Sequence, residues 1–193
     1  MSSATEPATQ SAHPVALELL QSVVDVARAI FGAQASSVFL LDEETDELVF
    51  QAVSGQGEEF LVGRRFPADR GIAGWVATSG EPMIVDRLSQ NTAFDRTFAQ
   101  STQYVPDALM AVPLLHDHQT LGVLEVLDPS PQTRSSLDEL ELLSMFARQA
   151  ATALRLVTHH RPAAPRVLTP DDHLTATRLL TQLHELLNVP GTP

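Results

Sequence analysis

Two segments of the chain carry the apolar spacing of an amphipathic helix. In the first, residues 15–31, the apolar positions are Val15, Leu19, Val23, Val26 or Ala27, and Ile30. Gly32 follows at once and predicts the end of that helix. In the second, Ser136 and Glu139 form a capping box that predicts a helix running to about Val157. Its apolar stripe, wide enough to face a core, is Leu140, Leu143, Ala147, Ala150, Leu154 and Val157.

Short apolar runs between these helices predict β-strands. The runs are 37–41, 48–53, 60–66, 83–86, 109–115 and 121–127, and 91–102 is a short helix or an ordered loop. The charged residues 42–47 join the first two runs, and the polar residues 116–120 join the last two. Because neither pair has an intervening helix, each predicts a hairpin. The pattern therefore predicts an α+β fold, a mainly antiparallel sheet with helices on its faces.

The segment 70–86 combines glycines with apolar residues. It predicts a helix over about 70–79 that ends at Gly80, followed by a strand at 83–86. Gly71 and Gly74 lack a Cβ and let the backbone approach a partner closely. A helix that starts near Gly71 also presents free N–H groups, which suit an anionic ligand. A tightly packed helix is the alternative, and the spacing alone favours it.

The two ends of the chain differ from the central part. Residues 1–13 are small and polar, without the basic and apolar regions of a signal peptide, and are expected to form a disordered tail. The central domain is expected over 14–158, followed by a proline-containing linker at 159–170. Within 171–193, an extra C-terminal amphipathic helix is expected at about 171–188, with a tail after it. Its apolar stripe, which needs a partner, is Leu174, Leu179, Leu180, Leu183, Leu186 and Leu187.

Composition narrows the function classes. The chain of 193 residues has a formal net charge of −12, and all 12 of its basic residues are arginine. This balance argues against non-specific binding of nucleic acid. The lack of lysine excludes Schiff-base chemistry and a P-loop lysine, and the lack of cysteine excludes thiolate catalysis, disulfides and Cys-ligated metals. No apolar run has the length needed to cross a bilayer, so no membrane partner and a cytoplasmic location are expected.

Four motifs in order resemble a GAF domain, the small-molecule sensor module of phytochromes, phosphodiesterases and bacterial signalling proteins. They are SSVFLLD (36–42), RGIAG through GEP (70–82), MAVPL (110–114) and LGVLE (121–125). The resemblance implies a GAF-like six-stranded, mainly antiparallel sheet with helices on both faces. It also implies that the terminal helices pack on one face and that a pocket lies on the other. A stand-alone bacterial GAF-domain sensory protein fits these motifs.

The resemblance also implies pocket residues. Ser37 on the first strand, Ile72 and Ala73 in the turn beside Gly71, and Glu125 on the last strand match ligand-binding positions of the cyclic-nucleotide branch. Glu125 also attracts attention on physical grounds, because a carboxylate among apolar strand residues must be solvated, paired or used. The alternative is a glutamate exposed at a sheet edge or ion-paired, for example with Arg70 or Arg87.

Aromatic and acidic residues near the motifs extend the list of candidates. Trp75, Phe94, Phe98 and Tyr104 are candidates to line the pocket and stack on a planar ligand, with core packing as the alternative. Asp86 and Asp95 are candidates for the rim of the pocket. His116 and His118 are interpreted as a polar hairpin tip and His159 and His160 as a solvated helix end, so no metal site is expected.

Departures from family patterns limit the ligand. Asp128-Pro129 stands where the cyclic-nucleotide branch has Asn-Lys, which removes the ion pair that closes that pocket. Without cysteine, covalent attachment of a bilin and the chemistry of free methionine-sulfoxide reductases are excluded. A cyclic nucleotide, non-covalent haem or another small molecule stays open as ligand. No catalytic motif is visible, and no enzyme activity is expected.

The expected function is a non-catalytic sensory module that binds a small molecule. Its state passes through the terminal helices to a signalling partner protein in trans. A homodimer is expected through the N-terminal helix and the helix at 137–158, with the last helix as an open contributor. The alternative is a GAF-fold dimerisation scaffold that binds no ligand, and a cyclic-nucleotide-binding regulator is the less favoured reading.

Overall fold

A computed structural model describes residues 14–91, 99–100, 104–133 and 136–159, apart from the side chains of Glu59 and His159. The chain divides into two units, 1–159 and 160–193, and all described residues belong to the first. The predicted tail at 1–13 and helix at 171–188 therefore lie outside the described residues, as do Phe94, Asp95 and Phe98.

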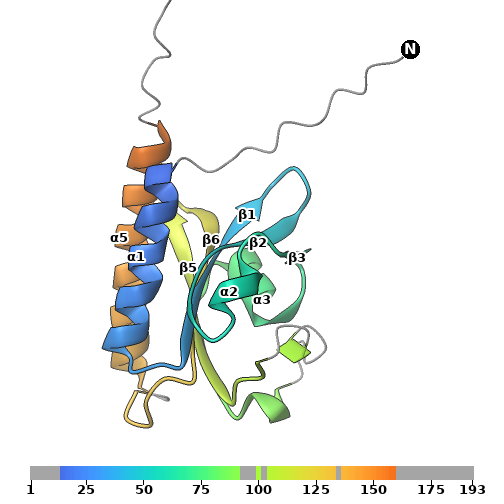
Figure 1. The fold of residues 1–193 in the computed structure, drawn as a ribbon, viewed down its shortest axis with the longest axis vertical. Helices are drawn as coiled ribbons and strands as arrows, with labels where there is room; N and C mark the ends of the chain where they lie inside the picture. The colour runs from blue at the N-terminus through green and yellow to red at the C-terminus, as the bar shows by residue number, and fades with distance from the viewer. Residues whose placement is uncertain (1–13, 92–98, 101–103, 134–135, 160–193) are drawn as a thin grey trace, which may run out of the picture. The chain divides into compact units, whose positions relative to one another are not determined.

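A six-stranded antiparallel sheet forms the centre of the unit (Figure 1). Its strands are β1 (Ala35–Asp42), β2 (Glu47–Gly55), β3 (Arg65–Pro67), β4 (Met83–Asp86), β5 (Ala108–His116) and β6 (Gln119–Leu127). They lie in the order β3-β2-β1-β6-β5-β4, so the hairpins β1–β2 and β5–β6 meet through the pairing of β1 with β6. The predicted α+β fold and antiparallel sheet are confirmed.

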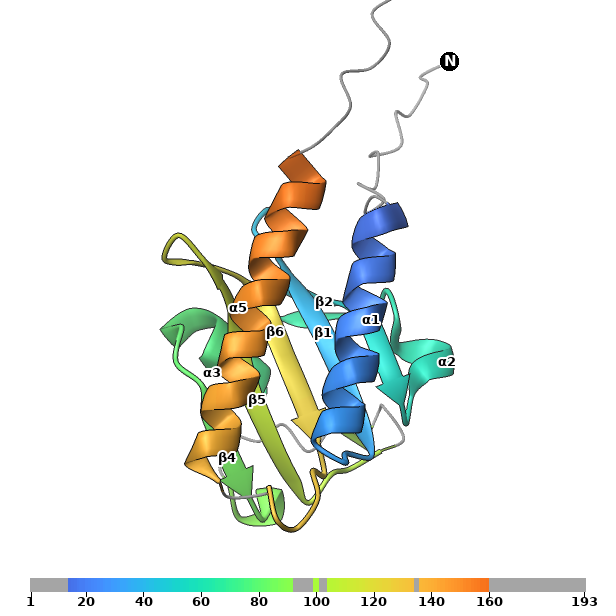
Figure 2. The ribbon, with the colours of Figure 1, turned by 90° about the vertical axis from the view of Figure 1, so that its left-hand side faces the viewer.

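Helices lie on both faces of this sheet. The long helices α1 (Pro14–Ile30) and α5 (Leu137–His159) run side by side across one face (Figure 2). The other face carries α2 (Glu58–Leu61) and α3 (Gly71–Ser79), and a 3-10 turn, η1 (Leu88–Gln90), follows β4. The sheet thus separates the terminal helices from the helices and loops of the opposite face.

Local sequence signals fix the helix ends. The hydroxyl Oγ of Ser136 accepts a hydrogen bond from the Glu139 N–H at 3.3 Å, which confirms the predicted cap of α5. Gly80 ends α3 with a φ of 70°, and its N–H donates to the Val76 carbonyl oxygen. This left-handed conformation strains a residue that carries a Cβ, so glycine suits the position.

The prediction of a strand over residues 60–66 is wrong. Residues 58–61 form the short helix α2, and only Arg65–Pro67 form a strand, which pairs with the start of β2. Leu61 is buried, whereas Phe60 and Val62 on either side of it are exposed. Among the described side chains of residues 58–62, only Leu61 points inward, and a helical turn satisfies this as well as a strand does.

Alternate residues of the same strands build two separate cores. On β6, Leu124 and Val126 pack under α1 and α5, in a cluster that includes Leu20 and Leu143. Val123 on the same strand faces the cluster that α2 and α3 cover. This follows from the period of two along a strand, which sends neighbouring side chains to opposite faces.

Candidate ligand-binding pocket

A cavity of about 540 Å³ lies on the face of the sheet opposite α1 and α5. Its lining comes from β1, β2, β3, β6, α2, the first turn of α3 and parts of the segment 99–109. Small-molecule sites in proteins typically have ~300–1,000 Å³ and a mainly apolar lining with a few polar groups. The cavity has the size and the make-up of such a site.

Glu125 places a carboxyl group in the lining of this cavity. It lies on β6, directly opposite Ser37 of β1 and Ala111 of β5, and is only 8% exposed. β6 is an inner strand, so the interpretation of Glu125 as an edge-exposed glutamate is wrong. Neither Arg70 nor Arg87 forms an ion pair with it among the residues that the structure describes.

The environment of Glu125 disfavours its charged form. Burial raises the pKa of its carboxyl group to about 7, because the carboxylate loses water and no cationic side chain in the described part of the chain offsets that loss. The nearby hydroxyl of Ser36 donates to the main chain of this residue instead, since the Glu125 carbonyl oxygen accepts from Ser36 Oγ at 2.9 Å. The side chain is therefore a buried acid without a donor among the described residues, facing open space.

Three phenylalanine rings form an apolar wall of the cavity. Phe39 of β1 lies against Phe50 of β2 with ring centroids 4.3 Å apart, and against Phe66 of β3 at 5.2 Å. A β-bulge after Val38 shifts the register, so that Phe39 stands directly opposite Phe50. The sequence does not predict these rings as pocket residues, because apolar alternation alone does not distinguish a core face from a pocket wall.

The first turn of α3 borders the cavity through Gly71, Ile72 and Ala73. The close approach predicted for Gly74 exists, but its partner is the protein itself. A Cβ on Gly74 would lie 2.7 Å from the main-chain oxygen of Ala68, closer than real Cβ atoms come. Gly74 therefore lets α3 pack onto the turn that precedes it, which fixes the position of the first turn at the cavity.

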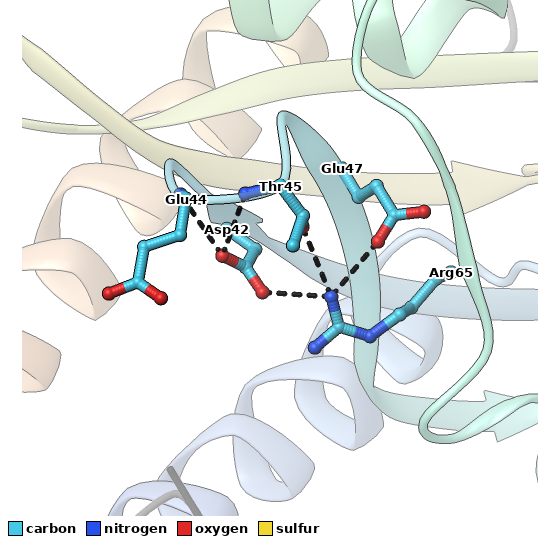
Figure 3. Close-up of polar contacts among 5 residues, drawn as sticks. All are labelled: Asp42, Glu44, Thr45, Glu47 and Arg65. Atoms are coloured by element: carbon cyan, nitrogen blue, oxygen red, sulfur yellow. Dashed lines mark hydrogen bonds and ion pairs between the residues drawn. The ribbon is translucent and has the colours of Figure 1, made fainter. Parts of the chain in front are cut away.

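Arg65 is the centre of a polar cluster at the rim of the cavity near β3. Nη1 of Arg65 donates to Asp42 Oδ2 at 2.8 Å, to Glu47 Oε2 at 3.0 Å and to Thr45 Oγ1 at 3.2 Å (Figure 3). Asp42 Oδ1 also accepts from the Glu44 N–H. The guanidinium of Arg65 lowers the pKa of the Asp42 carboxyl group. Arg65 thereby ties the β1–β2 turn to β3 and is itself engaged by two carboxylates.

Asp128 anchors another wall of the cavity. Its Oδ2 accepts a hydrogen bond from the hydroxyl of Tyr104, and its Oδ1 accepts from the N–H groups of Asp107 and Ala108, each at 2.9 Å. Tyr104 and Pro106 line the cavity, so this carboxylate holds the segment that closes it. Asp128, a departure from the family pattern in the sequence, thus anchors this wall in the structure.

The structure brings most of the predicted site residues together. Those in the cavity lining are Ser37, Gly71, Ile72, Ala73, Tyr104 and Glu125. Trp75 does not line it: it is 43% exposed, because Ile72, Ala73, Val76 and Ala77 take the inward face of α3. Asp86 does not line it either, since it is exposed at the end of β4 beside the inward Val85. Phe94 and Phe98 lie outside the described residues.

The described residues contain neither a cluster of metal ligands nor a membrane-spanning helix. Within 14–91, 99–100, 104–133 and 136–159, no group of three His, Asp or Glu side chains is arranged to hold a metal ion. His116 instead contacts Asp117 at 3.3 Å in the β5–β6 turn. No helix in the same part of the chain has the length and hydropathy needed to span a membrane.

The sequence model of the GAF domain matches residues 16–154. The chain belongs to the GAF domain family. GAF domains are signalling and ligand-binding modules, generally regulatory, that commonly dimerise and work with partner domains. The cavity of this chain thus lies in a module whose family has a ligand-binding role.

Curated relatives contain this module within longer proteins. A probable 3',5'-cyclic phosphodiesterase, pde-5, of Caenorhabditis elegans is 24% identical over 135 residues, which cover 64% of this chain and 18% of that protein. The cone cGMP-specific 3',5'-cyclic phosphodiesterase subunit alpha' of Mus musculus is 32% identical over 91 residues, which cover 47% of this chain and 11% of that protein. The chain spans less than a fifth of the length of either relative.

Solved structures share the fold at low identity. The GAF domain of a phosphoenolpyruvate-protein phosphotransferase from Coxiella burnetii superposes with a TM-score of 0.68 at 20% identity, covering 77% of this chain and 87% of that one. A free methionine-R-sulfoxide reductase from Neisseria meningitidis, solved with its substrate, gives 0.59 at 20% identity, covering 77% and 83%. The fold therefore occurs both in domains of larger proteins and in an enzyme.

Proposed function

We propose that the chain is a cytoplasmic, non-catalytic sensory module, which binds a small molecule in its GAF cavity. The bound state passes through the terminal helices α1 and α5 to a partner protein in trans. One observation carries the proposal: a cavity of about 540 Å³ contains a buried carboxyl group, Glu125, that no described residue pairs. The proposed ligand-binding residues are Ser37, Gly71, Ile72, Ala73 and Glu125, joined by Tyr104 and the phenylalanine wall.

The unpaired acid supports binding rather than a structural role. Buried polar groups in folded proteins nearly always have a hydrogen-bond partner, and each exception calls for an explanation. A titratable group with a raised pKa in a concave site is a common mark of a functional position. A ligand that supplies the missing donor explains both the open volume and the carboxyl group.

The sheet offers a short route from the cavity to the terminal helices. On β1, Ser37 faces the cavity and its neighbour Val38 packs in the core under α1 and α5. On β6, Glu125 faces the cavity while Leu124 and Val126 face the same core. A ligand that shifts the β1–β6 pair on one face therefore also moves the core side chains on the other face, against which α1 and α5 pack.

Exposed apolar side chains on the terminal helices support a homodimer. On α1 they are Val15, Leu17, Val26 and Ile30, and on α5 they are Leu137, Leu142, Met145 and Leu156. A second copy that contributes the same two helices covers such side chains. The alternative function, a dimerisation scaffold without a ligand, relies on these helices alone.

Sedimentation equilibrium tests the homodimer. We expect a dimer at micromolar concentration, and Leu156→Glu on α5, where Leu156 is 60% exposed, is expected to give a folded monomer. Val62→Glu is the matched control, because Val62 is 52% exposed but lies beside α2 on the other face. A wild-type monomer at this concentration contradicts the dimer, as does an equal loss of association in both variants.

A thermal-shift screen tests the ligand. Cyclic GMP, cyclic AMP, haem and a library of small metabolites are added to the wild-type chain, and any ligand that binds only the folded state raises the Tm. The cyclic nucleotides belong in the screen because the mouse relative is a cGMP-specific phosphodiesterase subunit. No hit at all, together with a crystal structure in which side chains fill the cavity, supports the scaffold instead.

A further inference from the structure

The charges around the cavity restrict the chemistry of a ligand, provided that the proposed binding function holds. Among the described lining residues, Glu125 is the only buried ionisable side chain. The other charged members of the lining are Arg65 and Arg70, and both are exposed to solvent. Arg65 is already engaged by Asp42 and Glu47. Among the residues that the structure describes, the buried charge that a ligand meets inside the cavity is therefore negative.

The apolar wall beside this acid suits an aromatic or compact apolar body. Phe39, Phe50 and Phe66 lie in contact with one another and all three line the cavity. Aromatic rings attract cations at their faces and planar rings at their faces and edges. A molecule with an apolar body and one positive group finds a partner for each part in this lining.

We infer that the cavity binds a small organic cation, with its protonated nitrogen on the Glu125 carboxylate and its apolar body against the three phenylalanine rings. An ionised carboxylate in this site is largely removed from bulk water and has no counter-charge among the described residues, and a cation supplies the counter-charge directly. A neutral donor supplies a hydrogen bond but leaves the charge uncompensated. An anion adds a second negative charge to a buried one.

The charge of the whole chain acts in the same direction. A formal net charge of −12 raises the local concentration of cations near the molecule. The groups that favour an anion are Arg70 and the start of α3, which also border the cavity. Arg70 is solvated, so its attraction is weaker than that of a desolvated carboxylate.

Three nearly isosteric probes separate the charge classes: benzamidine is a cation, benzamide is neutral and benzoate is an anion. Isothermal titration calorimetry with the full chain measures their affinities at pH 6 and pH 8. At pH 8 we expect benzamidine to bind at least tenfold more tightly than benzamide, and benzoate to bind more weakly than both. The preference narrows at pH 6, because burial raises the pKa of Glu125 to about 7 and the acid is then mostly protonated.

Two variants assign the effect to Glu125. Glu125→Gln keeps the shape of the side chain and removes its charge, so benzamidine is expected to lose at least tenfold in affinity while benzamide changes little. Glu81→Gln removes an exposed carboxylate after α3 that does not line the cavity, and is expected to leave both affinities unchanged. Melting curves of both variants confirm that they are folded.

The outcomes distinguish this inference from the proposed function. Equal or tighter binding of benzamide or benzoate at pH 8, or an unchanged benzamidine affinity in Glu125→Gln, overturns the inference while ligand binding stands. If none of the three probes binds, the hits of the thermal-shift screen decide: cations whose binding is lost in Glu125→Gln support the inference, and neutral or anionic hits refute it. No hit in either experiment refutes the proposed function as well.

Discussion

The two faces of the sheet are built from the same six strands but are covered differently: one is fully packed, and the other borders a cavity. On the helix face, α1 and α5 close over a continuous core, in which Leu20, Leu124 and Leu143 are fully buried. On the pocket face, α2, α3 and the segment 104–106 cover the strands incompletely and leave a cavity of about 540 Å³. One face thus holds the fold together, and the other keeps a space with a buried acid in it.

The difference shows how one strand contributes both to the packed core and to the lining of the cavity. Along β6, the alternation puts Leu124 and Val126 into the core and Glu125 into the cavity. The packed face fixes the backbone, and the fixed backbone holds Glu125 opposite Ser37 without any side-chain bond between them. The position of the acid is therefore maintained by residues that lie on the other face of the sheet, outside the cavity.

The largest effect is expected from truncation of the packed face. Leu124→Ala removes a fully buried side chain under α1 and α5 and is expected to lower the free energy of unfolding by about 3–5 kcal/mol. Leu109→Ala, on the pocket face, borders an existing cavity and is expected to cost about 2–3 kcal/mol, at the low end for such substitutions. Urea denaturation of both variants measures the two losses in free energy of unfolding. A larger loss for Leu109→Ala contradicts the view that the helix face contributes more to stability than the pocket face.

The second effect has the opposite sign. Glu125 has a pKa of about 7 in the folded protein and an ordinary value of 4.5 when unfolded, so the folded state binds its proton more tightly. Its burial therefore lowers stability progressively as pH rises from 4.5 to 7, by up to about 3 kcal/mol at pH 8. Glu125→Gln is expected to remove this loss and to be more stable than the wild type at pH 8, with little difference at pH 5.

The measurement is chemical denaturation of both proteins at pH 5 and pH 8. Glu81→Gln is the control, since that carboxylate is exposed. A stability difference between wild type and Glu125→Gln that does not change with pH contradicts the burial of an unpaired acid.

A third effect links the pocket face to the packing of α3. In Gly74→Ala, the new Cβ meets the main-chain oxygen of Ala68, which must move away. We expect a loss of about 1–3 kcal/mol, as for other overpacked sites, together with weaker ligand binding because the first turn of α3 shifts at the cavity. Ala77→Gly on the same helix is a control that loosens packing without a clash. An unchanged stability and affinity in Gly74→Ala means that the turn adapts freely.

The smallest effect is expected at the rim. Arg65→Gln breaks the contacts with Asp42 and Glu47, but exposed ion pairs contribute little to stability. The pKa of the Asp42 carboxyl group, which Arg65 lowers, is expected to rise towards its ordinary value of 3.8. NMR titration of the Asp42 carboxyl carbon measures this, and a large drop in melting temperature shows that the rim carries part of the fold.

The sequence predicts the features that depend on local patterns and misses those that depend on contacts between distant residues. The helix face was predictable, because the apolar spacing of α1 and α5 and the capping bond at Ser136 are local patterns. The motifs also predicted Glu125 as a pocket residue, and its side chain lines the cavity. The sequence predicts a strand where the short helix α2 lies, since Leu61 and Phe66, the two inward residues of the run 60–66, define no decisive period.

The missed parts of the pocket depend on contacts between distant residues. Asp128 is visible in the sequence only as a substitution, yet it holds Tyr104 and the start of β5 through bonds that span about twenty positions. Phe39 and Phe50 face each other because of the β-bulge after Val38, which no local sequence pattern predicts. Proximity to the motifs in sequence predicts Trp75 and Asp86 as pocket residues, whereas the turn of α3 and the pleat of β4 point them elsewhere.

The most direct test of the account is an NMR titration of the Glu125 carboxyl carbon in the free chain and in the presence of saturating benzamidine. The account predicts a midpoint near pH 7 in the free protein, because the acid is buried and unpaired in the cavity. With benzamidine bound, the midpoint falls, because the cation stabilises the carboxylate. A free-state midpoint near the ordinary value of 4.5 that the cation leaves unmoved would contradict the claim that this face of the sheet holds a ligand site built around Glu125.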